Sequence, residues 1–198
     1  MKENTKSKES RPPGRPRSEV SKKAILQTAY QLLKKHGIQS VSSHEIAEKA
    51  GVSTATIYRW WPSKEAVMLD AFFNKVQSIL PINPVGSFIE QLRDHVIRSA
   101  AFLASTDGKI MAKIILTIYD SPTLKKEFLE RFYLLRRSIG IDIANKAKTA
   151  GELPLNTNVE ILIDVLYGPL FYRLFLGHEV VNESFARSIA SIVLDHSL

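Results

Sequence analysis

The chain has 198 residues, of which 44% are hydrophobic, and its 27 Lys+Arg against 20 Asp+Glu give a formal net charge of +7 at pH 7. The absence of cysteine excludes disulfide scaffolds, zinc ribbons, iron–sulfur proteins and enzymes with a cysteine nucleophile. The polar amino terminus lacks the apolar stretch of a secretory signal, and no uninterrupted apolar run of about 18 residues occurs. We therefore expect a soluble cytoplasmic protein that does not enter a membrane.

The positive charge is concentrated in the first third of the chain. Through Lys64 there are 13 Lys+Arg and 5 Asp+Glu, an excess of +8, whereas the remaining residues carry 14 and 15, a net charge of −1. Such segregation predicts that one end of the protein meets a polyanion while the other end is an ordinary globular body. Nucleic acid is the first candidate for this polyanion.

The amino-terminal segment divides into an arm and a helix. Residues 1–17 are charged, rich in serine and proline, and have almost nothing to bury, so they are predicted to form a disordered basic arm. Ser18 is the predicted cap of an amphipathic helix, because the apolar residues after it recur at helical spacing until Gly37.

Two short helices are predicted next, joined by a glycine. Ser42-Ser43-His44-Glu45 has the form of a capping box, with the serine hydroxyl accepting from a backbone amide and the glutamate reaching back. The helix that it opens ends at Gly51. The second helix is predicted over 54–61, and Pro62 ends it.

The spacing of these two helices predicts a helix-turn-helix. Ile57 and Trp60 are expected to turn inward and wedge the second helix against the first. A helix corner that does not bind DNA is the alternative, and the adjoining basic excess argues against it. We therefore assign residues 18–64 to a DNA-binding domain. Ser63 is expected to cap a longer helix whose apolar residues continue to Leu80.

The remaining residues, 65–198, are predicted to form a helical body. Further capping boxes occur at Ser87-Phe88-Ile89-Glu90 and Thr157-Asn158-Val159-Glu160, and Pro122 suits the first position of a helix. The apolar residues between these signals follow helical spacing, and alternating strand patterns are missing. The predicted fold is all-α, with about nine helices.

Exposed side chains of the second short helix are expected to contact the bases of DNA. Arg59 suits guanine, and the methyl groups of Ala55 and Thr56 suit thymine. Groups at the amino end of the first short helix suit phosphate. The arginines of the arm suit a narrow minor groove, and a solubilising tail explains them equally well. Solvated surface charge is the alternative for Arg59 and Lys64. The predicted DNA-binding residues are Arg15, Arg17, Ser42, Ser43, His44, Ser53, Thr54, Ala55, Thr56, Tyr58, Arg59 and Lys64.

Residues 46–65 match every fixed position of the pattern I-A-x-x-A-G-V-S-x-x-T-x-Y-x-x-[FW]-x-x-K-E. In this stretch the chain resembles the amino-terminal domain of the tetracycline-repressor (TetR) family. Ser43 and His44 stand where the family often has an apolar residue and an arginine, and Ala55 stands at a frequent glycine. The resemblance implies a homodimeric transcriptional regulator, usually a repressor, that binds a palindromic double-stranded operator and is released by a small ligand. No cofactor or metal is predicted.

Residues 65–198 are assigned to ligand binding and dimerisation. A cavity lined by apolar and aromatic side chains with a few polar groups is expected between the helices. We expect its ligand, which the sequence does not identify, to move the helix after Ser63, so that the recognition helices no longer match half-sites about 34 Å apart. The predicted lining residues are Phe102, Ile114, Ile118, Tyr119, Phe132, Tyr133, Arg136, Tyr167 and Phe171.

The segment from Val159 to Gly177 is apolar nearly all round and is followed by a second apolar helix. A membrane span is the alternative, and Glu160, Asp164 and Arg173 argue against it. The two helices have more apolar surface than one subunit readily covers, which predicts a four-helix dimer interface. The predicted interface residues are Leu162, Leu166, Leu170, Leu174, Phe185, Ile189 and Val193.

Two other classes of function remain open. An enzyme that carries a DNA-binding module would need a catalytic site, but the five histidines show no helical pairing and no nucleotide-binding or nucleophile motif occurs. Scattered acidic residues leave a nuclease-like metal site possible. An architectural protein that binds DNA without a ligand is the other alternative, and it would show little preference among sequences.

Overall fold

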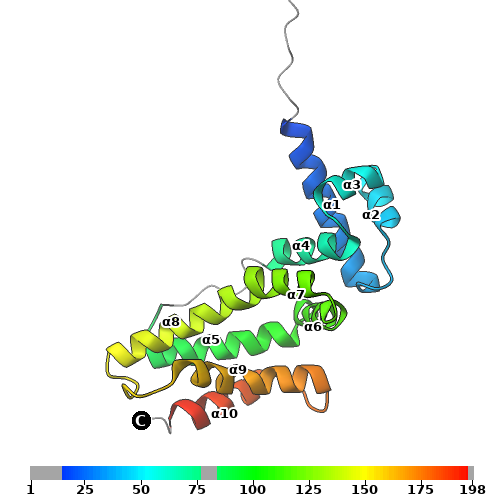
Figure 1. Ribbon diagram of the computed structural model, residues 1–198. Coiled ribbons are helices and arrows are strands. Elements are labelled where there is room, and N and C mark those ends of the chain that lie inside the picture. Colours follow the sequence, from blue (N-terminus) through cyan, green and yellow to red (C-terminus); the bar gives the residue numbers. More distant parts are fainter. Residues whose placement is uncertain (1–14, 77–83, 196–198) are drawn as a thin grey trace, which may run out of the picture.

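The computed structural model describes residues 15–76 and 84–195, and every regular element within those ranges is a helix (Figure 1). The amino-terminal unit consists of α1 (Arg15–His36), α2 (Ser43–Ala50) and α3 (Thr54–Trp60), and α4 (Lys64–Val76) follows it. The body consists of α5 (Phe88–Ala104), α6 (Thr106–Ile118), α7 (Pro122–Phe128), a π-helical turn η1 (Leu129–Tyr133), α8 (Leu134–Thr149), α9 (Val159–Leu176) and α10 (Glu183–Leu194). Because α7, η1 and α8 are continuous, the described ranges contain nine helical segments, as predicted.

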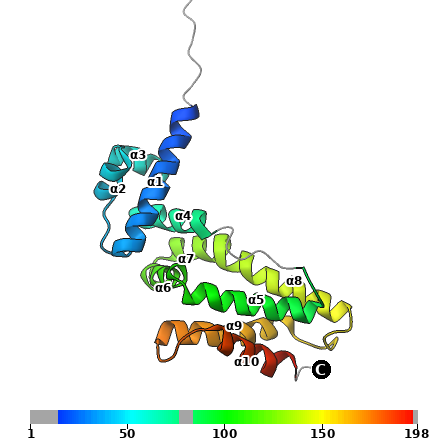
Figure 2. The same ribbon diagram turned by 180° about the vertical axis from the view of Figure 1, so that it is seen from behind.

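The amino-terminal unit projects from one end of the body, with α4 lying between the two (Figures 1 and 2). Its core is built where α1 packs on α2 and α4, and Ile25, Ile46 and Ile57 are completely buried there. In the body, α5 packs against α6, α8, α9 and α10. The helix that was predicted to continue to Leu80 is described as far as Val76, so its predicted last turn lies outside the described residues.

The start of α1 differs from the prediction. The helix begins at Arg15, three residues before the predicted cap at Ser18. Arg15 and Arg17 therefore lie in the first helical turn and not in an extended arm. Pro16 is compatible with this turn because the first amides of a helix have no intrahelical acceptor. The rest of the predicted arm, residues 1–14, lies outside the described residues.

The three predicted capping boxes have different outcomes. The box of Ser87 and Glu90 at the start of α5 is complete, with both reciprocal hydrogen bonds formed. Ser42 caps α2 as predicted, but Glu45 accepts from Lys49 at 2.9 Å instead of reaching back. The third box is wrong, because Asn158 and not Thr157 caps α9.

Trp60 was predicted to turn inward, but its neighbour Trp61 is the tryptophan that the structure buries. Trp60 is 37% exposed, with the Lys22 ammonium 5.3 Å from its ring centroid, whereas Trp61 is only 4% exposed. The prediction assumed one continuous helix through both residues. The structure ends α3 at Trp60, and the extended backbone of Trp61 turns that side chain into the core instead.

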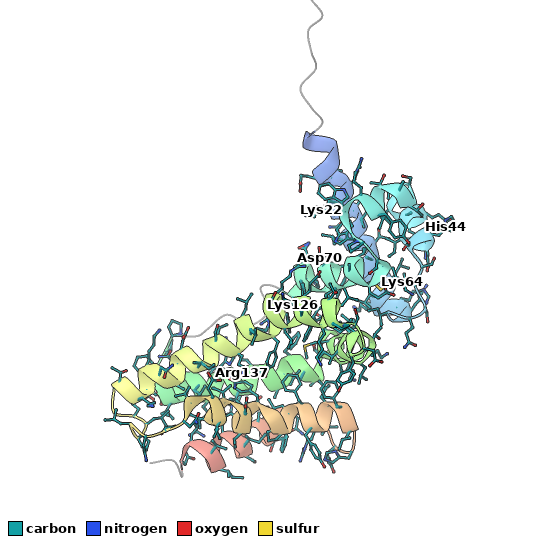
Figure 3. The ribbon with its side chains drawn as sticks, viewed as in Figure 1. Lys22, His44, Lys64, Asp70, Lys126 and Arg137 are labelled. Carbon is teal, nitrogen blue, oxygen red and sulfur yellow. The ribbon has the colours of Figure 1, made fainter. Side chains whose placement is uncertain are left out.

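Polar contacts join the amino-terminal unit to the body through α4 and α1. The Trp61 Nε1–H donates to Asp70 at 2.7 Å, and the Arg131 guanidinium forms an ion pair with the same carboxylate at 2.5 Å. Figure 3 shows Asp70 on α4, between the two units. A second link is the hydrogen bond from the Tyr30 hydroxyl to Asp107, which joins α1 to the start of α6.

None of the helices in the described ranges is both long and apolar enough to cross a membrane.

Replacing Trp61 with Phe should lower the free energy of unfolding by about 2 kcal/mol, because it removes the hydrogen bond to the Asp70 carboxylate. The matched control is Trp60→Phe, which should change the free energy by less than about 0.5 kcal/mol because that ring is partly exposed and has no such bond. Urea unfolding of both variants measures the difference. Equal effects would contradict the assignment of Trp61 as the anchoring residue.

Candidate nucleic-acid interface and ligand cavity

The turn between α2 and α3 depends on a glycine and a serine. Gly51 adopts φ +66, a left-handed conformation that costs glycine little because it has no Cβ. Its amide and that of Val52 bond to carbonyls at the end of α2. Ser53 then caps α3 by accepting from the Thr56 amide at 3.2 Å. Ile57 is the buried residue of α3, so the remaining faces of this helix point outward.

Six of the predicted DNA-binding residues line one open depression between α2, α3 and the start of α4, which we call the α2–α3 depression. The Tyr58 hydroxyl donates to the Ser43 Oγ at 3.0 Å and so connects the recognition helix to the amino end of α2. In Figure 3, His44 lies at the outer edge of the amino-terminal unit, away from the body. The six residues are Ser42, Ser43, His44, Thr54, Tyr58 and Lys64.

The other predicted residues of α3 lie outside this depression. Ala55 and Arg59 are exposed and lie one helical turn apart, on the same side of α3. The hydroxyls of Ser53 and Thr56 are 3.0 Å apart and form a hydrogen bond with each other. Ser53, Ala55 and Arg59 are exposed and Thr56 is partly exposed, so all four are accessible from outside the α2–α3 depression.

Lys64 has a structural role that the sequence did not reveal. Its Nζ donates to the carbonyl oxygens of Gln39 at 3.2 Å and Val41 at 3.1 Å. Two of its three hydrogens are therefore used to hold the segment between α1 and α2 (Figure 3). Lys64 thus positions the amino end of α2, where Ser43 and His44 lie.

The body contains a cavity of about 240 Å³ between α5, α6, η1, α8 and α9, which we call the α5–α9 cavity. Six of the nine residues predicted as lining do line it: Phe102, Phe132, Tyr133, Arg136, Tyr167 and Phe171. The prediction missed the other residues of the lining: His95, Ser99, Leu103, Met111, Arg137, Ile163, Asp164 and Gly168.

Three of the predicted lining residues do not reach the cavity. Ile114 and Ile118 are buried in the core along α6, and Tyr119 is 65% exposed with the Lys125 ammonium 4.6 Å from its ring centroid. Residue type alone therefore did not show which side chains point into the cavity. A signal for two missed residues was present on α5: Ser99 follows His95 by four residues and Phe102 follows Ser99 by three, which places all three on one face of the helix.

His95 is the most deeply buried polar group of the cavity, with 3% of its surface exposed. Its Nδ1 lies 2.5 Å from the Tyr167 hydroxyl oxygen, and its Nε2 has no hydrogen-bond partner among the residues that the structure describes. Burial lowers the pKa of His95 to about 4, and the positive charges of Arg98 and Arg136 act in the same direction against the smaller opposing effect of Asp94. Burial raises the pKa of Tyr167, so both side chains are neutral near pH 7.

Two neighbouring arginines line the cavity, and they differ in their partners. Arg137 is paired with Glu160 and with Asp164, the latter at 2.7 Å, and thereby joins α8 to α9 (Figure 3). Arg136 lies with its guanidinium carbon 4.5 Å from the Phe132 ring centroid and donates to the carbonyl of Val76 at 2.7 Å. Burial lowers the pKa of Arg136.

Most of the predicted dimer-interface residues face the interior of their own subunit. Leu162, Leu166, Leu170 and Ile189 are buried within the chain, so they were assigned to the wrong face. Leu174, Phe185 and Val193 are partly buried and pack against the same core. The prediction failed because α9 is apolar on all sides, so the spacing of its apolar residues does not indicate which face is buried. The large apolar residues exposed on these two helices are Ile161, Val165, Tyr172, Phe175, Leu176 and Ile192.

Within the described ranges, His, Asp and Glu side chains form no group of three or more that could hold a metal ion.

Comparisons with known proteins agree with this arrangement. Residues 25–71 match the family model described as bacterial regulatory proteins, tetR family, and residues 82–193 match the tetracyclin repressor-like C-terminal domain. The uncharacterized HTH-type transcriptional regulator YdeS of Bacillus subtilis (strain 168) is 39% identical over 176 residues, which are 89% of each chain.

Solved structures share this fold over most of the chain. The TetR family transcription regulator SCO0332 superposes with a TM-score of 0.72 at 25% identity, covering 88% of this chain and 97% of that one. The flavonoid-responsive regulator FrrA gives a TM-score of 0.68 at 23% identity, covering 91% and 96%.

The helix-turn-helix and the helical body that carries it define a DNA-binding transcriptional regulator. The chain belongs to the TetR family.

The buried His95 should make stability depend on pH in a defined direction. Its pKa in the folded protein, about 4, lies below its ordinary value of 6.5, so protonation favours the unfolded chain. This contribution is complete above about pH 6.5 and is lost as the pH falls towards 4. Between pH 7 and 4.5, unfolding free energy should fall by roughly 2–3 kcal/mol more in the wild type than in His95→Gln, as measured by urea unfolding. An equal fall in both proteins would contradict the neutral, buried state of His95.

Proposed function

We propose that this chain is a homodimeric repressor that binds a palindromic operator and leaves it when a small molecule occupies the α5–α9 cavity. The observation that carries the proposal is the position of α4. This helix follows the recognition helix α3 directly, and its last residue, Val76, is hydrogen-bonded to Arg136 of the cavity wall. A change in the cavity can therefore reach the recognition helix through a single element. The protein would act in the cytoplasm.

The recognition helix α3 would read bases with its exposed residues. Arg59 suits the O6 and N7 acceptors of guanine, while Ala55 and the methyl of Thr56 suit thymine. The α2–α3 depression would follow the phosphate backbone, because it contains hydroxyls, a histidine and the amino end of α2. Ser53 and Thr54 at the start of α3 add further hydroxyl donors, and Lys64 keeps the α2 end in place.

The dimer would form through an exposed stripe on α9, which we call the α9 stripe: Ile161, Val165, Gly168, Tyr172 and Phe175. Its alternating spacing of four and three residues is the pattern with which two helices pack side by side. Ile192 exposes a further apolar side chain on α10, which packs against α9. A twofold pairing of these helices would place two recognition helices on one operator.

Control by a small molecule has support from the shared fold. The structural neighbour FrrA is named as flavonoid-responsive. In this chain the α5–α9 cavity is lined mostly by apolar and aromatic side chains with a few polar groups, which is typical of ligand sites. Release would follow if the ligand favours a state in which α4, and with it α3, has moved.

Selection of bound DNA from a random pool should yield a palindrome with two half-sites about 34 Å apart. On that palindrome, Arg59→Ala should weaken binding roughly 10- to 100-fold because one bidentate base contact is lost. Lys113→Gln, on the exposed surface of α6, removes the same charge and should leave the affinity nearly unchanged. Fluorescence anisotropy measures both. A selected pool without symmetry, or equal losses in the two variants, would contradict the proposed interface.

A charge in the α9 stripe should separate the subunits. Val165→Glu should weaken dimerisation at least roughly 100-fold, because the carboxylate would be buried without a partner. Leu116→Glu is the control, since Leu116 is also apolar and exposed but lies on α6. Sedimentation velocity at micromolar concentration should show monomers for the first variant and dimers for the second. Dimers in both would place the interface elsewhere.

A further inference from the structure

We propose that the α5–α9 cavity binds a small aromatic carboxylate, whose anionic group pairs with Arg136 and whose ring lies among the aromatic side chains of the wall. The inference rests on the proposed function only for the consequence of binding, namely release of DNA. Binding itself is argued from the cavity alone.

The size and the lining of the cavity favour a compact aromatic ligand. Its volume of about 240 Å³ has room for a molecule of one or two rings. Aromatic rings stack favourably on other aromatic rings, in offset or edge-on arrangements. The aromatic side chains of the wall are Phe102, Phe132, Tyr133, Tyr167 and Phe171.

The charges of the lining favour an anion. Within the lining, the charges of Arg137 and Asp164 balance each other; Glu160, which also pairs with Arg137, lies outside the lining and is largely exposed. Arg136 forms no ion pair with any residue in the described ranges. Since His95 is neutral, the lining has one uncompensated positive charge in partly dehydrated surroundings. A carboxylate is the group that the planar guanidinium binds best, because it can accept two parallel hydrogen bonds.

The pair of His95 and Tyr167 supplies a second polar contact. When the Tyr167 hydroxyl donates to Nδ1, the single hydrogen of the neutral imidazole lies on Nε2. This Nε2–H is then a buried donor without an acceptor, which is costly unless a ligand provides one. A carboxylate oxygen or a ring hydroxyl supplies that acceptor, whereas an ammonium group does not.

Recognition of the anion would be linked directly to α4. The Arg136 guanidinium now donates to the carbonyl of Val76, the last residue of α4. A carboxylate competes for the same donors with a full negative charge, and charge-assisted bonds are about twice as strong as neutral ones. The ligand would thereby weaken the contact that holds the end of α4 against the body. Arg136 would both bind the ligand and transmit the effect of binding to α4.

Three probes with one ring system and different charges test the ligand class on the full-length chain: 2-naphthoate, 2-naphthamide and 2-naphthylmethylamine. Isothermal titration calorimetry should show naphthoate binding at least roughly tenfold more tightly than the amide, with the ammonium compound weakest. Arg136→Gln should reduce the preference for the anion to less than about threefold, while Arg136→Lys should retain part of it. The control variant Lys113→Gln should keep the full preference.

Equal binding of acid and amide by the wild type, binding of none of the probes, or an unchanged preference in Arg136→Gln would overturn the proposed ligand class. If Arg136→Gln does not fold, the wild-type series and Arg136→Lys decide the question. Operator binding measured without any probe separates this result from the proposed function. A protein that binds its palindrome but not naphthoate refutes the ligand class alone, and one that binds naphthoate but no palindrome refutes the repressor.

Discussion

The Asp70 carboxylate accepts the indole N–H of Trp61 and pairs with the guanidinium of Arg131, so one side chain on α4 connects the end of the recognition helix to the body. The orientation of α3 depends on this arrangement, because Trp61 caps that helix and is anchored in the core. The arginine lies over the ring of Phe73, with its guanidinium carbon 4.9 Å from the ring centroid, and this contact protects part of the pair from water.

The other end of α4 is held by a different arginine. Arg136 donates to Val76 from the wall of the α5–α9 cavity, next to the arginine that joins α8 to α9. The helix is therefore fixed near its middle by an ion pair that lies outside the α5–α9 cavity, and at its end by a hydrogen bond to a residue of the cavity wall. This asymmetry suits a lever that pivots at Asp70, and it connects the cavity to the DNA-binding unit without a long chain of contacts.

Local signals were sufficient for most of the fold and for part of the sites. The caps at Ser42 and Ser87 and the turn at Gly51 are interactions between residues close in sequence, so their patterns predicted them. Six cavity residues were predicted from residue type, because apolar and aromatic side chains with a few polar groups are typical of ligand cavities. The predictions failed for Trp60 and for the leucines of α9, where a change of backbone conformation or an apolar surface on every side made spacing ambiguous.

The sequence by itself determined the helical class, the helix-turn-helix, the family resemblance and the separation of charge, because each depends on residue type and short-range spacing. Only the tertiary structure decided which face of α9 is exposed, that Lys64 binds backbone carbonyls, and that His95 lacks a partner at Nε2. Each of these depends on contacts between residues far apart in the chain. Such contacts are set by how whole helices pack against one another, and local periodicity carries no information about that packing.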